Sequence, residues 1–193
     1  MEENIQKYFH ESASVINQSR ELLARPIAEA AGALFSALEN NGKVLACGNG
    51  GSAAEAQHFS AELVGRFERD RPGLAAIALT TDSSILTAVA NDYDFSQIFA
   101  RQVRALGQPG DVLLALSTSG DSANVLAAIE EAHEREMRVI ALTGREGGQV
   151  GSRLCGGDFQ LCVPGENTAR IQEVHLLILH CLCNAVDTML LGE

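Results

Sequence analysis

The sequence has no long apolar run, no cluster of basic residues and no paired cysteine motif, and each absence argues against a class of protein. No stretch approaches the ~20 successive apolar residues that a membrane-spanning helix needs. The opening MEENIQKYFHES carries acidic side chains and no apolar segment, which is not typical of a secretory signal. The five cysteines include no Cys-x-x-Cys pair, which favours a reducing, cytoplasmic setting.

The charge balance is acidic, with 14 Lys and Arg against 25 Asp and Glu and a net charge of −11. A nucleic-acid-binding protein carries a basic face, whereas here Lys and Arg gather only in the mixed run RFERDRP. The composition therefore argues against direct nucleic-acid binding. The acidic composition does not argue against binding of a small anionic ligand, because the backbone N–H groups of a helix N-terminus hold phosphate without a basic side chain.

Residues 1–193, of which 46% are apolar, suit one globular domain, with helices over 1–41 and an α/β core over 42–193. Apolar spacing predicts a helix over 3–24, and Pro26 opens a second that runs to Leu38. Apolar runs then alternate with helical segments. We predict strands at 44–47, 76–79, 112–116, 139–142 and 159–163, and helices at 53–64, within 83–106, after 122 and over 167–190.

Strands of this kind predict a doubly wound five-stranded parallel sheet with helices on both faces. Ligands of such sheets bind at the carboxyl ends of the strands. We therefore expect the functional residues directly after the predicted strands.

The first loop of this kind, GNGGS at 48–52, joins a strand to a helix, and its glycines let the backbone approach a ligand. A tight turn without a ligand is the alternative interpretation. Gly48, Gly50 and Ala53 also fit the dinucleotide pattern GxGxxA. The acidic residue that should follow after about 20 residues would have to be Asp82, more than 30 residues on, which disfavours a dinucleotide.

The second loop, STSGDS at 117–122, places four hydroxyl side chains around a glycine between a strand and a helix. An ordinary turn with a helix cap needs only one or two of them. Hydroxyls and helix-terminal N–H groups together form a cradle for a phosphate monoester. Two such loops indicate a phosphorylated polyol as ligand.

His58 and Glu62 are four residues apart on the helix after the first loop, so both side chains leave the same face. An imidazole and a carboxylate one turn apart are a reasonable half-site for zinc or a similar ion. By spacing alone, a surface hydrogen bond is the more frequent outcome.

The last helix offers several partners for that half-site. At 100° per residue, Gln172 lies about 80° from His180, Glu173 about 20° and His175 about 140°. Geometry thus allows either Gln172 or Glu173 beside His180, and it separates the two histidines.

GNGGS, the STSGxS loop and the ARIQEVHxxxxH helix together resemble the sugar isomerase (SIS) family, and within it the isomerases of seven-carbon sugar phosphates. The similarity covers the whole chain and includes HFSAEL, RFERxRP, ALTTD and GQPGDVLLALSTSG. It implies the interconversion of sedoheptulose 7-phosphate and D-glycero-D-manno-heptose 7-phosphate, which begins heptose synthesis for the lipopolysaccharide core. It also implies a homotetramer with shared active sites and one zinc ion per subunit.

The resemblance implies roles for individual residues. The positions that match the metal site are His58, Glu62, Gln172 and His180, and those that match the proton-transfer pair are Glu62 and His180. Substrate contacts fall on Asn49, Gly50, Gly51, Ser52, Glu62, Arg66, Asn91, Asp92, Ser117, Thr118, Ser119, Ser122 and Gln172. His175 is then structural, as are His10 and His133, which we place on helices far from any strand end. One departure is Ala169, where the family often has aspartate.

Segments such as QVRALG and HCLCNAVD resemble equally a SIS-type tetramer that binds the replication initiator and is not known for isomerase activity. That protein lacks the glutamate and histidine at the positions of Glu62 and His180, and this chain has both. We therefore interpret the chain as an aldose–ketose isomerase, with the non-catalytic regulator as the alternative.

Overall fold

The computed structural model describes residues 1–192, and its centre is a parallel sheet of five strands in the order β2-β1-β3-β4-β5. The strands are β1 (Val44–Gly48), β2 (Ala76–Ala78), β3 (Val112–Ser117), β4 (Arg138–Gly144) and β5 (Phe159–Val163). The helices are α1 (Glu2–Glu39), α2 (Gly51–Val64), α3 (Ser83–Asp92), α4 (Ala100–Leu106), α5 (Ala123–Glu134), α6 (Val150–Arg153) and α7 (Thr168–Leu191), with a short 3₁₀ helix at Phe95–Gln97. The predicted doubly wound parallel sheet is confirmed.

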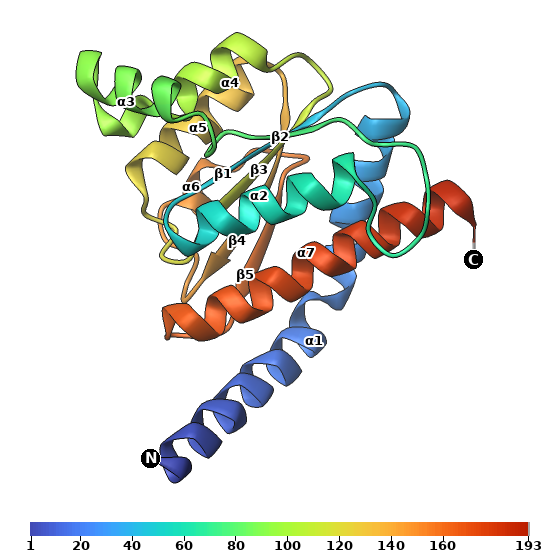
Figure 1. Ribbon diagram of the computed structural model, residues 1–193, viewed down its shortest axis with the longest axis vertical. Helices are drawn as coiled ribbons and strands as arrows, with labels where there is room; N and C mark the ends of the chain where they lie inside the picture. Colours follow the sequence, from blue (N-terminus) through green and yellow to red (C-terminus); the bar gives the residue numbers. More distant parts are fainter. Residues whose placement is uncertain (193) are drawn as a thin grey trace.

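The strands are apolar on both sides because helices cover both faces of the sheet (Figure 1). Successive side chains of a strand point to opposite faces. Leu114 of β3 therefore packs with α1, α2 and α7, whereas its neighbour Leu113 packs with α4, α5 and α6.

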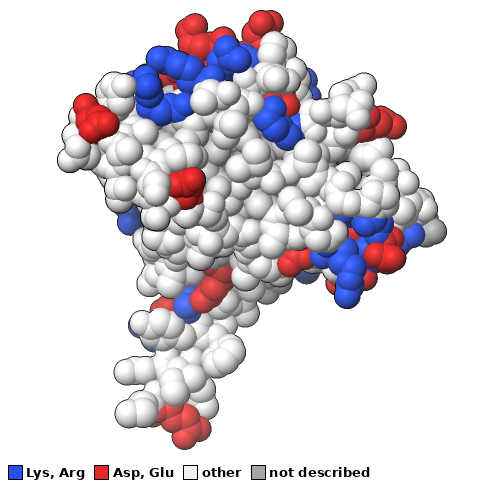
Figure 2. All heavy atoms as spheres, turned by 45° about the horizontal axis from the view of Figure 1, so that its top comes forward, with Lys and Arg blue, Asp and Glu red and all other residues white. Residues whose placement is uncertain are grey.

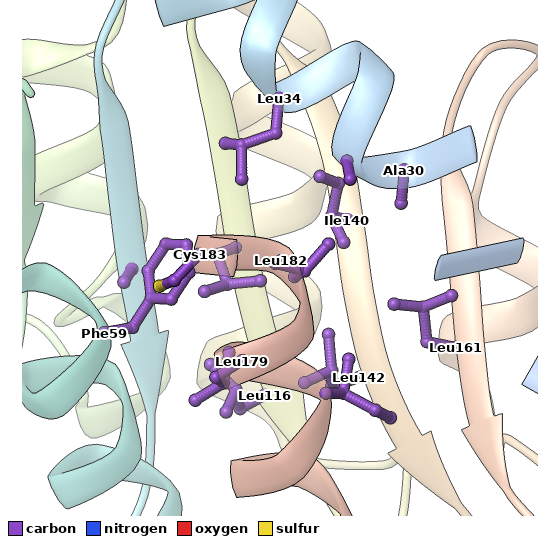
Figure 3. Packing of buried hydrophobic residues seen from close by; sticks show 14 of the residues in the cluster. Ala30, Leu34, Phe59, Leu116, Ile140, Leu142, Leu161, Leu179, Leu182 and Cys183 are labelled. Atoms are coloured by element: carbon purple, nitrogen blue, oxygen red, sulfur yellow. The ribbon is translucent and has the colours of Figure 1, made fainter. Parts of the chain in front are cut away.

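Helix α7 is the main element of the apolar core on the face of the sheet that α1, α2 and α7 cover. Leu179 and Leu182 of α7 lie against the sheet beside Phe59 of α2, as Figure 3 shows, and all three side chains are fully buried. By length and composition α7 could also cross a membrane, with a mean hydropathy of 1.7 over its most apolar stretch. Core helices of globular proteins share that composition, and α7 packs on α1, α2 and the sheet here.

The prediction of two helices before the first strand was wrong, because α1 is one continuous helix that includes Pro26. Proline lacks the N–H that would bond the carbonyl of Leu22. Leu22 is 60% exposed, so water can take the place of that bond. Packing of Ala30, Ala31 and Leu34 into the core holds the helix beyond the proline.

The strand order reverses between β1 and β3, which run side by side although β2 separates them in the sequence. Ligands of doubly wound sheets bind at this switch point, outside the carboxyl ends of the two strands. The loops at 48–52 and 117–122 follow these two strands. The fold therefore brings both predicted phosphate loops to the same crevice.

A buried ion pair lies near the carboxyl end of α2, between Arg71 of the segment that follows α2 and Asp187 of α7. Arg71 Nε donates to Asp187 Oδ1 over 2.5 Å, and both side chains are at most 2% exposed. Arg71 also donates to the backbone carbonyls of Glu62 and Leu63, at the end of α2. One guanidinium group therefore holds the carboxyl end of α2 against the last turns of α7.

We expect Arg71→Met to destabilise the fold by about 3–5 kcal/mol, because it leaves the Asp187 carboxylate buried and unpaired. Urea unfolding followed by circular dichroism measures the change. The control is Arg25→Met, which removes an exposed pair with Glu29 and should leave the unfolding midpoint where it is. Equal midpoints for Arg71→Met and the wild-type chain would contradict the role of the ion pair.

Candidate functional site

Helix α2 begins directly after β1, with Gly50 as its N-cap at a φ of +57°. Glycine has no side chain that could cap the first N–H groups, so the helix N-terminus faces the crevice uncapped. Ser52 lies in the first turn and is 3% exposed, which places its hydroxyl at the base of the loop.

The 117–122 loop is arranged differently from an ordinary helix cap. Ser122 occupies the N-cap position of α5, but its hydroxyl makes no cap bond and lies 2.9 Å from Ser117 Oγ. Asp82 and Asn167, by contrast, cap α3 and α7 with their side chains. The hydroxyls of Ser117 and Ser122 thus face one another at the N-terminus of α5, which no side chain caps, while Ser119 Oγ accepts the N–H of Asp121 within the loop.

The two loops are joined by a pair of amide side chains. Asn49 and Asn124 each donate Nδ2–H to the other's Oδ1 over 2.8 Å. Asn124 is buried in the first turn of α5. Asn124 is not among the residues predicted from the sequence, because its partner lies on another loop and no spacing in the sequence links the two.

Three of the four expected metal ligands converge between α2 and α7. His58 Nε2 lies 2.9 Å from His180 Nε2 and 3.5 Å from Glu62 Oε1. Phe67 packs on the His180 ring with centroids 5.5 Å apart. Two imidazole nitrogens this close share either a proton or a metal ion, so the donors fit a zinc-type ion.

Gln172, the fourth expected ligand, lies over the first loop. A Cβ added to Gly51 would be 2.6 Å from Gln172 Nε2. The side chain of Gln172 therefore fills the space next to the N-terminus of α2, on the same helix as His180. This contact links the loop at 48–52 to α7.

The other residues that are expected to contact the substrate are spread over several elements of the fold. Arg66 is exposed in the turn after α2 and donates to Glu68 O. Asn91 and Asp92 bond one another at the exposed end of α3, away from α7 (Figure 1). Thr118 and Ser119 are half-buried in their loop. Ala169 is exposed in the first turn of α7 and donates its N–H to Asn167.

Beneath the first loop lies a buried acid–imidazole pair. His175 Nε2–H donates to Thr143 O over 2.9 Å, which leaves its Nδ1 lone pair 4.0 Å from Glu55 Oε2. Burial lowers the pKa of His175 to about 4 and raises the pKa of Glu55 to about 7, although a hydrogen bond from Ser52 opposes the second shift. His175 is thus neutral and Glu55 titrates near neutral pH.

Figure 2 shows that Lys and Arg form no continuous field on the face it displays, and that charged side chains gather near the rim of that face. Near the second loop, Arg145 and Ser119 line a hollow of about 290 Å³ that also contains Asp121, Glu146 and Glu166. Backbone N–H groups and hydroxyls are therefore the main anion-binding groups of the two loops.

Comparisons of the sequence and of the fold with known proteins lead to the same family. The sequence profile of the SIS domain matches residues 7–144. The phosphoheptose isomerase of Methylibium petroleiphilum is 64% identical over 100% of this chain and 96% of its own length, and that of Aromatoleum aromaticum is 65% identical over 97% and 95%. The solved phosphoheptose isomerase of Neisseria gonorrhoeae superimposes with a TM-score of 0.93 at 51% identity, covering 97% of this chain and 98% of its own.

We expect Glu55→Gln to become more stable than the wild-type chain as the pH rises. The pKa of Glu55 is raised in the folded state, so its stabilising contribution is complete below the unfolded value of 4.5 and is lost as pH rises through about 7. Above pH 8 the difference should reach the order of 3 kcal/mol. Urea unfolding at several pH values tests this, with the exposed Glu39→Gln as control; a difference that does not grow with pH would contradict the assignment.

Proposed function

This chain belongs to the SIS domain family, among its phosphoheptose isomerases, and we propose that it interconverts sedoheptulose 7-phosphate and D-glycero-D-manno-heptose 7-phosphate. The observation that carries the proposal is the meeting of His58, Glu62 and His180 between α7 and α2, the helix that the first of the two loops opens. The same activity belongs to heptose synthesis for lipopolysaccharide, and we propose the cytoplasm as its location.

In this proposal the phosphate lies between the two loops. Ser52, Ser117, Ser119 and Ser122 supply hydroxyls, with Thr118 alongside, and the uncapped ends of α2 and α5 supply backbone N–H groups. The Asn49–Asn124 pair fixes the separation of the two loops, because each amide is satisfied only when the other is in place. Gly50 and Gly51 let the sugar phosphate approach the backbone.

The expected metal ligands are His58, Glu62, Gln172 and His180. Imidazole nitrogen and carboxylate oxygen are the donors that zinc prefers, and the convergence of three of these side chains supports the assignment. A zinc ion held by these residues would supply a Lewis acid that polarises the carbonyl group of the sugar.

Aldose–ketose isomerisation moves one proton between C1 and C2 through a cis-enediol and a second proton between the two oxygens. Glu62 is the base that takes the carbon-bound proton and returns it to the neighbouring carbon. His180 moves the proton between the oxygens. Each such group contributes roughly 10²–10⁴-fold to the rate. Asn49, Asn91, Asp92 and Arg66 orient the sugar in this proposal.

We expect Glu62→Gln to lower kcat for sedoheptulose 7-phosphate by roughly 10²–10⁴-fold. Turnover by the wild-type chain should fall with a chelator and return with added zinc. The exposed Glu68→Gln, six residues further along, is the matched control and should keep wild-type turnover. Near-wild-type turnover in a metal-loaded Glu62→Gln would overturn the assignment of the base. No turnover by the folded, zinc-loaded wild-type chain would favour the regulator.

We propose a homotetramer with shared active sites, and the exposed start of α1 supports a contact between subunits. Its first turns project from the rest of the chain (Figure 1) and expose Ile5, Tyr8 and Phe9 by 53–75%. These three residues line an apolar hollow of about 400 Å³. Exposed apolar groups of this extent mark a protein contact.

We expect light scattering to give the mass of four chains of 20.5 kDa for the wild-type protein and a smaller particle for Phe9→Glu. The control is Lys7→Glu, about 200° around the helix from Phe9, where the side chain is 72% exposed. If the Phe9→Glu protein kept the mass of the wild-type protein, the exposed start of α1 would not be part of the contact between subunits.

A further inference from the structure

A second cluster of potential metal ligands lies at the amino ends of β4 and β5, the opposite end of the sheet from the two loops. His133 comes from the last turn of α5, and Cys155 and Asp158 come from the turn before β5. One ligand atom from each residue lies within 4.8 Å of the other two. The expectation that His133 is far from any strand end was wrong, because Asp158 immediately precedes β5.

The carboxylate of Asp158 is held in place by two backbone amides. Oδ1 accepts the Val139 N–H and Oδ2 accepts the Cys155 N–H, each over 2.8 Å. His133 Nε2 also lies 2.8 Å from Oδ2. Because an ionised carboxylate only accepts hydrogen bonds, this ring nitrogen carries the proton and donates it. The turn that leads into β5 thus fixes the carboxylate, and the carboxylate fixes the imidazole.

This tautomer leaves the lone pair on His133 Nδ1, and that nitrogen faces Cys155 Sγ over 3.9 Å. A histidine that binds a metal usually donates its other ring N–H to a carboxylate, which orients the ring and raises its basicity. The cluster therefore has the arrangement of a metal ligand with its supporting acid before any ion is bound.

We propose that Cys155 Sγ and His133 Nδ1 bind a thiophilic divalent ion of the zinc class, with Asp158 as the carboxylate that orients the imidazole. A sulfur and a nitrogen on one tetrahedral zinc ion, at bond lengths of about 2.3 and 2.0 Å, are roughly 3.5 Å apart. The observed 3.9 Å closes to this value by a small rotation of the exposed Cys155 side chain. Thiolate and imidazole together select zinc over calcium or magnesium.

The surroundings leave room for the remaining ligands of the ion. A hollow of about 350 Å³ borders the three side chains and also contains Glu136 and Arg138. Two coordination positions are therefore open to water. Since the ligands come from α5 and from the turn before β5, a bound ion would tie the end of that helix to the edge strand.

The donor atoms separate this site from the one between α2 and α7. The expected ligands there are nitrogen and oxygen atoms, whereas the second site contains a thiolate. Cobalt(II) can replace zinc in either site, but only a thiolate ligand gives the sulfur-to-cobalt charge-transfer band in the near ultraviolet. The band therefore reports the second site alone and does not depend on isomerase activity.

The experiment titrates the reduced, metal-free protein with cobalt(II) and then counts the zinc ions bound per chain. The wild-type chain should give the charge-transfer band, and Cys155→Ser should lose it together with one zinc ion per chain. Cys162→Ser is the matched control, since Cys162 is a partly exposed cysteine on β5 outside the cluster, and it should keep both. Asp158→Asn should bind 10–100-fold more weakly.

A wild-type chain without the band, or a Cys155→Ser chain that keeps the band or the full zinc count, would overturn the proposal. Circular dichroism of each variant distinguishes loss of the ion from loss of the fold. If the thiol and imidazole only form a hydrogen bond, cobalt(II) will leave the near-ultraviolet spectrum of the wild-type chain unchanged.

Discussion

The position of α2 against α7 is the constraint on which the switch-point site depends, and the guanidinium group of Arg71 sets it. The expected ligands His58 and Glu62 belong to α2 and His180 belongs to α7, so their distances are those between the two helices. Arg71 holds the carbonyls at the end of α2 and the carboxylate of Asp187 at once. The buried charge pair adds a directional contact to the apolar packing of the helices, because separating the two groups would leave each charge buried and unpaired.

The second constraint is the strand order, which no side chain of the site determines. The reversal between β1 and β3 brings together two loops that are about 70 residues apart in the chain. Once the loops are adjacent, short polar contacts define their spacing. The Asn49–Asn124 pair is satisfied only at one separation, so the sheet positions the loops approximately and the amides fix the distance.

The features that the sequence predicted well are those that depend on local pattern. Continuous apolar runs identified the strands, and the glycines and hydroxyls after them identified the loops, because both follow from neighbouring residues. The spacing of His58 and Glu62 correctly placed them on one helix face. The break expected at Pro26 did not occur, since tertiary packing of the following turns outweighs one missing hydrogen bond.

Long-range contacts could not be found in this way. Neither the Arg71–Asp187 ion pair nor the Asn49–Asn124 pair has a fixed sequence spacing, and each partner has an ordinary polar side chain. Helical geometry alone also could not decide whether Gln172 or Glu173 lies beside His180. The roles that the resemblance assigned to Asn91 and Asp92 stay predictions, and the two side chains bond one another at the exposed end of α3.

The contact between Gly51 and Gln172 has a consequence for how this sequence can vary. Gly51 has no positive φ, so the turn itself does not require a glycine, and a Cβ there would displace the amide end of the Gln172 side chain. A shorter residue at 172 would open the space for a methyl group at 51. The two positions are therefore coupled, and each substitution that one of them accepts depends on the residue present at the other.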